Sequence, residues 1–163
     1  MKTLVEQLSQ YAAYHRDRRN IRTHFIGIPM IVLAIAILLA RPGFTVGDWY
    51  VTPALIVMTI LTLYYLKLDL LYGIVMAILL SACLFIAGIV AQSDLVTWLI
   101  WGVGLFVVGW VFQFVGHIYE GRKPAFFDDI MGLAIGPLFV LAEAGFLLGL
   151  RKDLESEISA RRI

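Results

Sequence analysis

The sequence predicts an all-α integral membrane protein: a helical bundle of four to five transmembrane or re-entrant helices, preceded by an N-terminal amphipathic interfacial helix. Hydrophobic residues make up 61% of the 163 residues and charged residues only 15%, whereas soluble domains have about 45–50% and about 25%. Four apolar runs approach the roughly 20 residues that cross a bilayer, and none shows the alternation of a membrane barrel. We therefore expect a single membrane domain over 1–163, with the interfacial helix in 1–23, the bundle in 24–150 and a polar tail in 151–163.

The first segment has the spacing of an amphipathic helix. Between Leu4 and His15, apolar residues and His15 itself recur every three or four positions, so they share one helix face. Such a helix lies in the membrane interface, with His15 directed toward the bundle. The arginine-rich stretch 16–23 then turns the chain, and Asn20 or Thr23 is the expected cap of the first span.

The spans follow with short connections, which favour antiparallel neighbours. A fifth apolar run over 130–150 contains Pro137 and Glu143, so it either crosses the bilayer or re-enters it. The four clearer runs cover 24–41, 49–66, 70–91 and 95–117.

Basic residues indicate the orientation, because cytoplasmic loops are rich in Lys and Arg. Five of them lie in 1–23, and Lys67 and Arg122–Lys123 fall on the same side, whereas Arg41 stands almost alone on the other. This pattern predicts a cytoplasmic N-terminus. The basic tail conflicts with it if the fifth run crosses the bilayer.

All three histidines are expected at one membrane face. With four spans, the first begins and the fourth ends on the same side, which places His24 and His117 near His15. Gln113 and Glu120 share the helix face of His117. Bundle metalloproteins bind iron or manganese with a carboxylate and an imidazole three residues apart. Three imidazoles, one carboxylate and open positions suit non-haem Fe(II) and oxygen chemistry, and the ligand types also fit zinc.

Other polar residues have competing interpretations. Glu143 lies inside an apolar run, where an ionisable group is functional by default, so it is a further candidate ligand. Asn20 is either a turn residue or a site residue. Asp128 and Asp129 are expected to cap the following helix, and Cys83 is a small buried residue that has no disulfide partner within the chain.

Two other classes of function fit the same residues. The protein could bind haem through His24 and His117, or be a small transporter or assembly factor whose histidines relay protons. No inverted repeat supports a transporter. The absence of a basic stripe with interleaved aromatic residues argues against a nucleic-acid partner.

Three stretches resemble one known family. The first runs from Tyr14-His15 through Asn20 to His24-Phe25-Ile26-Gly27-Ile28-Pro29, the second from Trp110 through Gln113, His117 and Glu120 to Ala125, and the third from Gly136 to Glu143. Together they resemble the small membrane family typified by the yeast 2-hydroxy fatty acid dioxygenase of the endoplasmic reticulum. The resemblance covers residues 2 to about 150.

The resemblance implies an Fe(II)-dependent dioxygenase that uses O₂ to shorten a 2-hydroxy fatty acid by one carbon, an α-oxidation. By motif position it implies His15, His24 and His117 as metal ligands, Glu120 as a ligand or catalytic residue, and Gln113 in the same motif. The membrane is then that of the endoplasmic reticulum or a bacterial inner membrane.

The expected substrate suits a site at the membrane face. Its tail lies in the bilayer and its carboxylate at the interface, where the carboxylate and the 2-hydroxyl can chelate Fe(II). Arg122 or Lys123 could pair with the carboxylate, although their charges also serve as topology signals.

Overall fold

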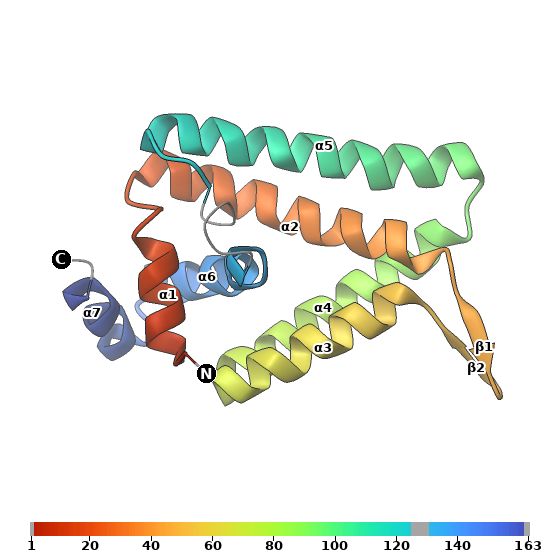
Figure 1. The fold of residues 1–163 in the computed structure, drawn as a ribbon, viewed down its shortest axis with the longest axis horizontal. Coiled ribbons are helices and arrows are strands. Elements are labelled where there is room, and N and C mark those ends of the chain that lie inside the picture. Colours follow the sequence, from red (N-terminus) through yellow and green to blue (C-terminus); the bar gives the residue numbers. More distant parts are fainter. Residues whose placement is uncertain (1, 125–130, 162–163) are drawn as a thin grey trace. The chain divides into compact units, whose positions relative to one another are not determined.

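The computed structural model describes residues 2–124 and 131–161. In this part of the chain it contains seven helices and one two-stranded hairpin, which confirms the predicted all-α class. In chain order (Figure 1) they are α1 (Leu4–Ala12), α2 (Arg18–Ala40), β1 (Phe44–Val46), β2 (Trp49–Val51), α3 (Pro53–Leu68), α4 (Leu70–Ala91), α5 (Leu95–Glu120), α6 (Met131–Leu147) and α7 (Lys152–Ala160).

Three of the described helices are long and apolar enough to cross a membrane, namely α2, α4 and α5. Helix α3 is apolar but shorter. Helices α6 and α7 are long and apolar enough to cross a membrane only when they are taken together, and the chain bends by 117° between them. The chain divides into two compact units, Met1–Ile28 with Val111–Ile163 and Pro29–Trp110. Helices α2 and α5 contribute one part to each unit.

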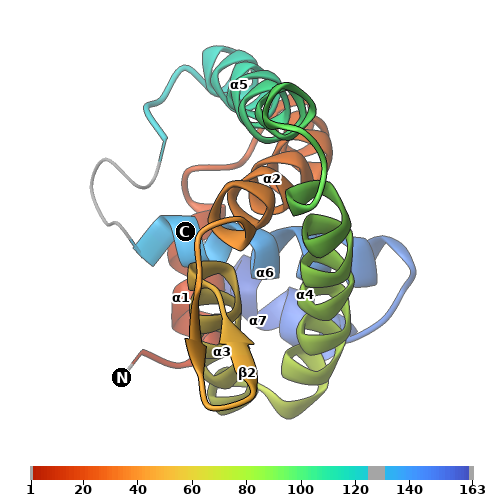
Figure 2. The ribbon, with the colours of Figure 1, turned by 90° about the vertical axis from the view of Figure 1, so that its right-hand side faces the viewer.

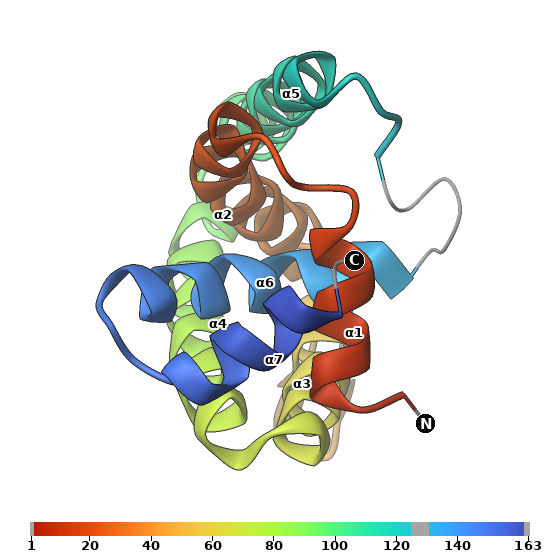
Figure 3. The ribbon, with the colours of Figure 1, turned by 90° about the vertical axis from the view of Figure 1, so that its left-hand side faces the viewer.

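Helix α1 is amphipathic, as predicted. Thr3 and Glu6 form a capping box, because the Thr3 hydroxyl accepts from the Glu6 amide and the Glu6 carboxylate accepts from the Thr3 amide, which satisfies two N-terminal donors. Its apolar face, including Leu8 and Ala12, is buried and contacts α6 and α7 (Figure 3). Its location in the membrane interface stays a prediction.

Helix α2 starts earlier than the sequence suggested. The stretch 16–23 was predicted to turn, yet α2 begins inside it. The cap is Asp17, whose Oδ1 accepts from the Arg19 amide at 2.8 Å. Asn20 and Thr23 therefore lie within the helix, and their predicted capping role is wrong, because the carboxylate of Asp17 supplies the acceptor one turn earlier.

The predicted span over 49–66 is wrong at its beginning. Its first three residues form β2, which pairs with β1 in an antiparallel hairpin. Gly47 adopts a φ of 58° in the turn, a conformation that glycine adopts readily, and α3 starts only at Pro53 after its cap, Thr52. The hairpin register is Phe44↔Val51, Thr45↔Tyr50 and Val46↔Trp49.

Helices α3 and α4 form a tightly connected pair in the second unit (Figure 2). One residue, Asp69, serves both helices: its backbone N–H donates to Tyr65 O at 3.0 Å, and its carboxylate accepts from the Tyr72 amide at 2.9 Å. A Cβ at Gly73 would lie 2.5 Å from Leu66 Cα, so only glycine allows this close approach.

The fifth apolar run forms α6, with Pro137 inside the helix. At the corner that follows, Gly149 and Arg151 adopt positive φ values of 77° and 51°. Helix α6 continues through Pro137, and the 117° bend lies between α6 and α7 at the end of the run, so whether the run over 130–150 crosses or re-enters the bilayer stays a prediction. The expected polar tail is helical, and Leu154 and Ile158 on α7 are buried.

Two single-residue predictions remain. Cys83 lies half-buried on α4 as a free thiol. Asp128 and Asp129, the expected caps of the following helix, lie outside the described residues.

Candidate metal centre

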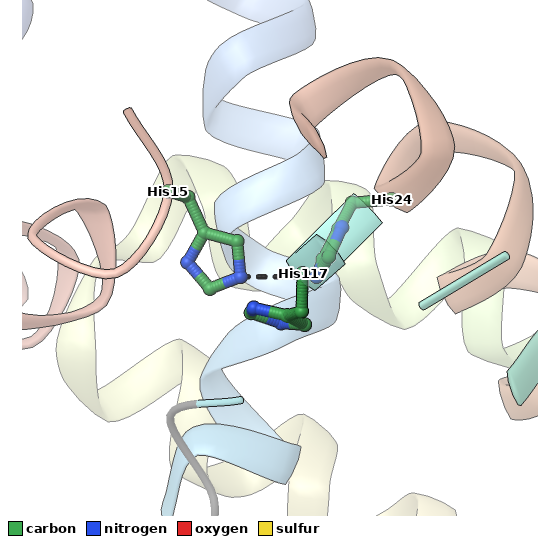
Figure 4. Close-up of side chains that lie close together, drawn as sticks. All are labelled: His15, His24 and His117. Atoms are coloured by element: carbon green, nitrogen blue, oxygen red, sulfur yellow. Dashed lines mark hydrogen bonds between the residues drawn. The ribbon is translucent and has the colours of Figure 1, made fainter. Parts of the chain in front are cut away.

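Three elements of the first unit bring the histidines together. His15 lies in the turn after α1, His24 in the second turn of α2, and His117 in the last turn of α5. Their side chains are all buried, with exposed fractions of 0%, 1% and 6%. Figure 4 shows the three rings converging on one point.

The spacing of the rings suits one ion. A ligating nitrogen from each histidine lies within 4.8 Å of the other two, and His15 Nε2 is 3.0 Å from His24 Nε2. Two nitrogens that bind the same ion, each at roughly 2.0–2.1 Å, are about 3 Å apart when they occupy adjacent coordination positions. The ring planes meet at 68–79°, so the rings present edges rather than faces to one another.

Backbone carbonyls fix the tautomer of two of the rings. His15 Nδ1 lies 2.8 Å from Tyr11 O, and His24 Nδ1 lies 2.9 Å from Asn20 O. A carbonyl oxygen only accepts, so both Nδ1 atoms carry the proton, and each neutral ring has its lone pair on Nε2. The two lone pairs face each other at 3.0 Å, an arrangement that a cation between them stabilises. Histidines that bind metals usually donate their other N–H to a carbonyl in this way.

Three buried polar atoms near the centre make no hydrogen bond among the described residues. They are His117 Nδ1, Gln113 Nε2 and Asn20 Oδ1. Buried polar atoms are nearly always paired in proteins. These atoms therefore indicate a site that receives a ligand, and the three imidazoles beside them fit a metal ion.

Aromatic rings enclose His15. The Tyr11 ring stacks on it at 4.2 Å with an interplanar angle of 5°, and Phe139 of α6 lies 5.6 Å away. Burial raises the pKa of Tyr11, so its phenol stays neutral. The wall formed by these rings limits the access of water to the imidazoles.

Gly116 allows α5 to approach α2 at this level. A Cβ there would lie 2.2 Å from Thr23 Oγ1, 2.4 Å from Asn20 Oδ1 and 3.3 Å from His24 Nδ1. Any larger residue would displace the turn of α2 that carries His24.

Comparison with known proteins assigns the chain to a family. The model of the family described as "2-hydroxy-palmitic acid dioxygenase Mpo1-like" matches residues 1–147. The chain belongs to the Mpo1-like family. A curated relative from Saccharomyces cerevisiae, 2-hydroxy-palmitic acid dioxygenase MPO1, is 31% identical over 157 residues, which cover 95% of this chain and 87% of the relative. No solved structure matches the chain.

In this Mpo1-like chain, Glu120 lies beside the histidines but bonds elsewhere. Its carboxylate accepts from the backbone amides of Arg16 and Asp17 and from the side chain of Asn20. Among the described residues, the one group of three or more possible metal ligands contains only the three histidines.

The remaining predicted site residues lie around this centre. Glu143 is half-buried on α6 and is not part of the histidine group. Arg122 is exposed and donates from Nη1 to Ala13 O at 3.1 Å, and Lys123 is exposed next to it.

Sequence reasoning missed the contributions of Tyr11, Phe139 and Gly116. Tyr11 precedes His15 by four residues on the predicted helix face, a spacing that could have revealed it. No feature of the neighbouring sequence identifies Phe139 or Gly116, because both residues contact other helices.

Proposed function

We propose that the protein is an Fe(II)-dependent dioxygenase that shortens 2-hydroxy fatty acids by one carbon at a membrane face. The observation that carries the proposal is the set of three buried imidazoles, two of which direct Nε2 lone pairs at each other over 3.0 Å. Family membership and the activity for which the yeast relative is named support the reaction class.

His15, His24 and His117 would hold the metal. An Fe(II) ion bound there would supply Lewis-acid activation and the means to reduce O₂. The carbonyls of Tyr11 and Asn20 hold two of the rings in the ligating tautomer, and the burial of all three side chains would limit the access of bulk water to the ion.

The overall reaction balances as RCH(OH)COOH + O₂ → RCOOH + CO₂ + H₂O. The C1–C2 bond breaks, C2 becomes the new carboxyl carbon and C1 leaves as CO₂, while O₂ accepts four electrons. No co-reactant besides O₂ is required.

Gln113 is the proposed contact for the polar head of the substrate. Its side chain is 6% exposed, and Nε2 is a buried donor that makes no hydrogen bond among the described residues. A carboxylate or 2-hydroxyl oxygen would satisfy it, whereas an unpaired buried donor costs about 1–3 kcal/mol. Arg122 and Lys123, both exposed, would attract the carboxylate during its approach.

The membrane placement is also part of the proposal. His24 lies near the start of one membrane-spanning helix and His117 near the end of another, so the centre would face one side of the bilayer. The basic residues of 1–23 favour the cytoplasmic side, and residues 1–163 would act as one membrane domain of the endoplasmic reticulum or a bacterial inner membrane.

The arrangement does not favour haem. The His24 and His117 ring centroids are 5.1 Å apart, and the His15 ring lies within 5.0 Å of both. A porphyrin between two axial imidazoles needs more room than this.

Protein purified in detergent without a nickel-affinity tag tests the proposal. We expect about one iron per chain, no Soret absorbance, and conversion of 2-hydroxypalmitic acid to the acid one carbon shorter with stoichiometric O₂ uptake. Protein that binds neither iron nor another divalent ion, and that leaves the substrate unchanged, would exclude this function.

A further inference from the structure

We infer that Glu120 is a positioning residue, which fixes two of the histidines against the end of α5, and that it is not a metal ligand. This inference rests on the proposed metal centre. It assigns a different role to the one carboxylate whose spacing from His117 suggested a fourth ligand.

The first argument is the number of hydrogen bonds that Glu120 accepts. Oε1 accepts from the Arg16 amide at 2.8 Å, and Oε2 accepts from the amides of Arg16 at 3.0 Å and Asp17 at 2.9 Å and from Asn20 Nδ2 at 3.0 Å. Three N–H groups therefore donate to the carboxylate, and the Arg16 amide is shared between its two oxygens. A carboxylate has about four lone-pair sites, so an ion would compete with these donors for the same group.

The second argument is electrostatic. The amides of Arg16 and Asp17 lie at the N-terminal end of α2, where the helix dipole and the unpaired N–H groups favour a negative charge. Hydrogen bonds from amides to a carboxylate are roughly twice as strong as those between neutral groups. Glu120 therefore has a strongly favourable partner that is not a metal.

The third argument is where these contacts lie in the chain. Arg16 and Asp17 directly follow His15, and the backbone carbonyl of Asn20 accepts from His24 Nδ1. Glu120 thus holds the residue after one ligand and the residue that orients another, while it follows His117 by three positions on the same helix.

Arg122, two residues after α5 ends, adds a second connection. Its Nη1 donates to Ala13 O at 3.1 Å, two residues before His15. The end of α5 carries His117 and Glu120, and together with Arg122 it binds the backbone on both sides of His15. An ion held by three imidazoles alone also keeps more positions open for a chelating 2-hydroxy acid and O₂ than one with a carboxylate ligand.

Cobalt(II) binding separates a positioning role from a ligand role. We would measure the Co(II) dissociation constant, and the visible d–d spectrum at saturation, for the wild type, Glu120→Gln and Glu120→Ala. Glu157→Gln is the matched control, because Glu157 is an exposed carboxylate on α7 paired with Arg161. We expect Glu120→Ala to bind Co(II) about 10–100-fold more weakly, Glu120→Gln to lose less, and all saturated spectra to match the wild type.

A changed spectrum at saturation in Glu120→Gln would overturn the inference, because it would show that a ligand has been replaced. Equal affinity in Glu120→Ala and the wild type would overturn it as well. Failure of the wild type itself to bind Co(II) would instead exclude the proposed metal centre.

Metal-free protein gives an independent measurement. We expect Glu120→Ala to lower the thermal unfolding midpoint without metal, because the contacts to Arg16 and Asp17 exist in the apo protein.

Asn20→Ala should weaken Co(II) binding, and the double variant should lose less affinity than the sum of the two losses, since the residues share one hydrogen bond. Additive losses, or an unchanged apo midpoint, would contradict the positioning role. Asn20→Ala keeps this test available if Glu120→Ala does not fold.

Discussion

The two units of the chain bury different kinds of side chain. Among the described residues, every buried polar side chain lies in Met1–Ile28 or Val111–Ile163, whereas the buried side chains of Pro29–Trp110 belong to Ala, Ile, Leu, Met and Tyr. The buried polar residues are Gln7, Ser9, His15, Asn20, His24, Gln113 and His117. Because burying polar groups is unfavourable unless they find partners, their concentration in one unit indicates where the chemistry lies.

The same contrast appears along single helices. On α5, a Cβ at Gly102 would meet the Leu38 side chain at 2.5 Å, whereas a Cβ at Gly116 would meet Thr23 Oγ1 and Asn20 Oδ1. Both glycines allow close helix packing. One packs against an aliphatic side chain and the other against the polar residues of the centre, so the sequence neighbourhood of a glycine does not reveal its role.

Removing an imidazole should have the largest effect. We expect His15→Ala, His24→Ala and His117→Ala each to reduce bound metal from about one ion per chain to nearly none, as measured by elemental analysis. Met76→Ala is the control, because Met76 is 3% exposed in the second unit. It should lower the free energy of unfolding by about 2–5 kcal/mol and keep full metal occupancy. Full occupancy in all three histidine variants would refute the centre.

Three glycine variants sharpen the comparison. Gly116→Ala and Gly102→Ala should each lower the free energy of unfolding by about 1–3 kcal/mol, because the added methyl overpacks a close contact. Only Gly116→Ala should also weaken metal binding. Gly104→Ala, also on α5 and with nothing within 4 Å of its Cβ, should be neutral or slightly stabilising. Equal metal affinity in Gly116→Ala and Gly104→Ala would contradict the role of Gly116.

Gln113→Met tests the proposed contact to the substrate. It removes a buried donor that makes no hydrogen bond within the part of the chain that the structure describes, so stability and metal content should stay near wild type. kcat/KM should fall about 10–100-fold, which corresponds to a hydrogen bond to a charged group of about 1.5–3 kcal/mol. Gln92→Met, an exposed change in the second unit, should leave kcat/KM unchanged. An unaltered kcat/KM in Gln113→Met would remove this residue from the site.

The smallest effect is expected from Trp98→Phe in the second unit. Trp98 Nε1 donates to Ile37 O at 2.9 Å, and Arg41 Cζ lies 5.0 Å from the indole centroid. Losing the hydrogen bond and weakening the cation–π contact should lower the free energy of unfolding by about 1–2 kcal/mol, measured by chemical denaturation in detergent. Metal content should not change, and a loss of metal would show that the centre also depends on the second unit.

Local sequence features determined some of the helix boundaries. The run over 70–91 became α4 with the same bounds, and α5 begins at Leu95 as expected, because apolar runs and caps are local properties. The start of α2 had a local signal that the prediction overlooked, because Asp17 caps the helix through the Arg19 amide. The hydrogen bonds that Glu120 accepts there, from residues more than 100 positions earlier in the chain, were not predictable. The turn residues Gly47 and Asp48 between short apolar stretches were a local signal for the hairpin that the helical prediction overlooked.

By itself, the sequence determined that the chain forms apolar helices, because composition depends only on residue order. It also predicts, from the number of expected crossings, that the three histidines lie near span ends on one side. Only the tertiary structure decided how the side chains of the three histidines approach one another. The 3.0 Å approach of His15 Nε2 to His24 Nε2, the ring wall of Tyr11 and Phe139, and the bonding of Glu120 all depend on contacts between distant segments. Side-chain direction and hydrogen-bond partners are set by packing, and spacing along one helix cannot specify them.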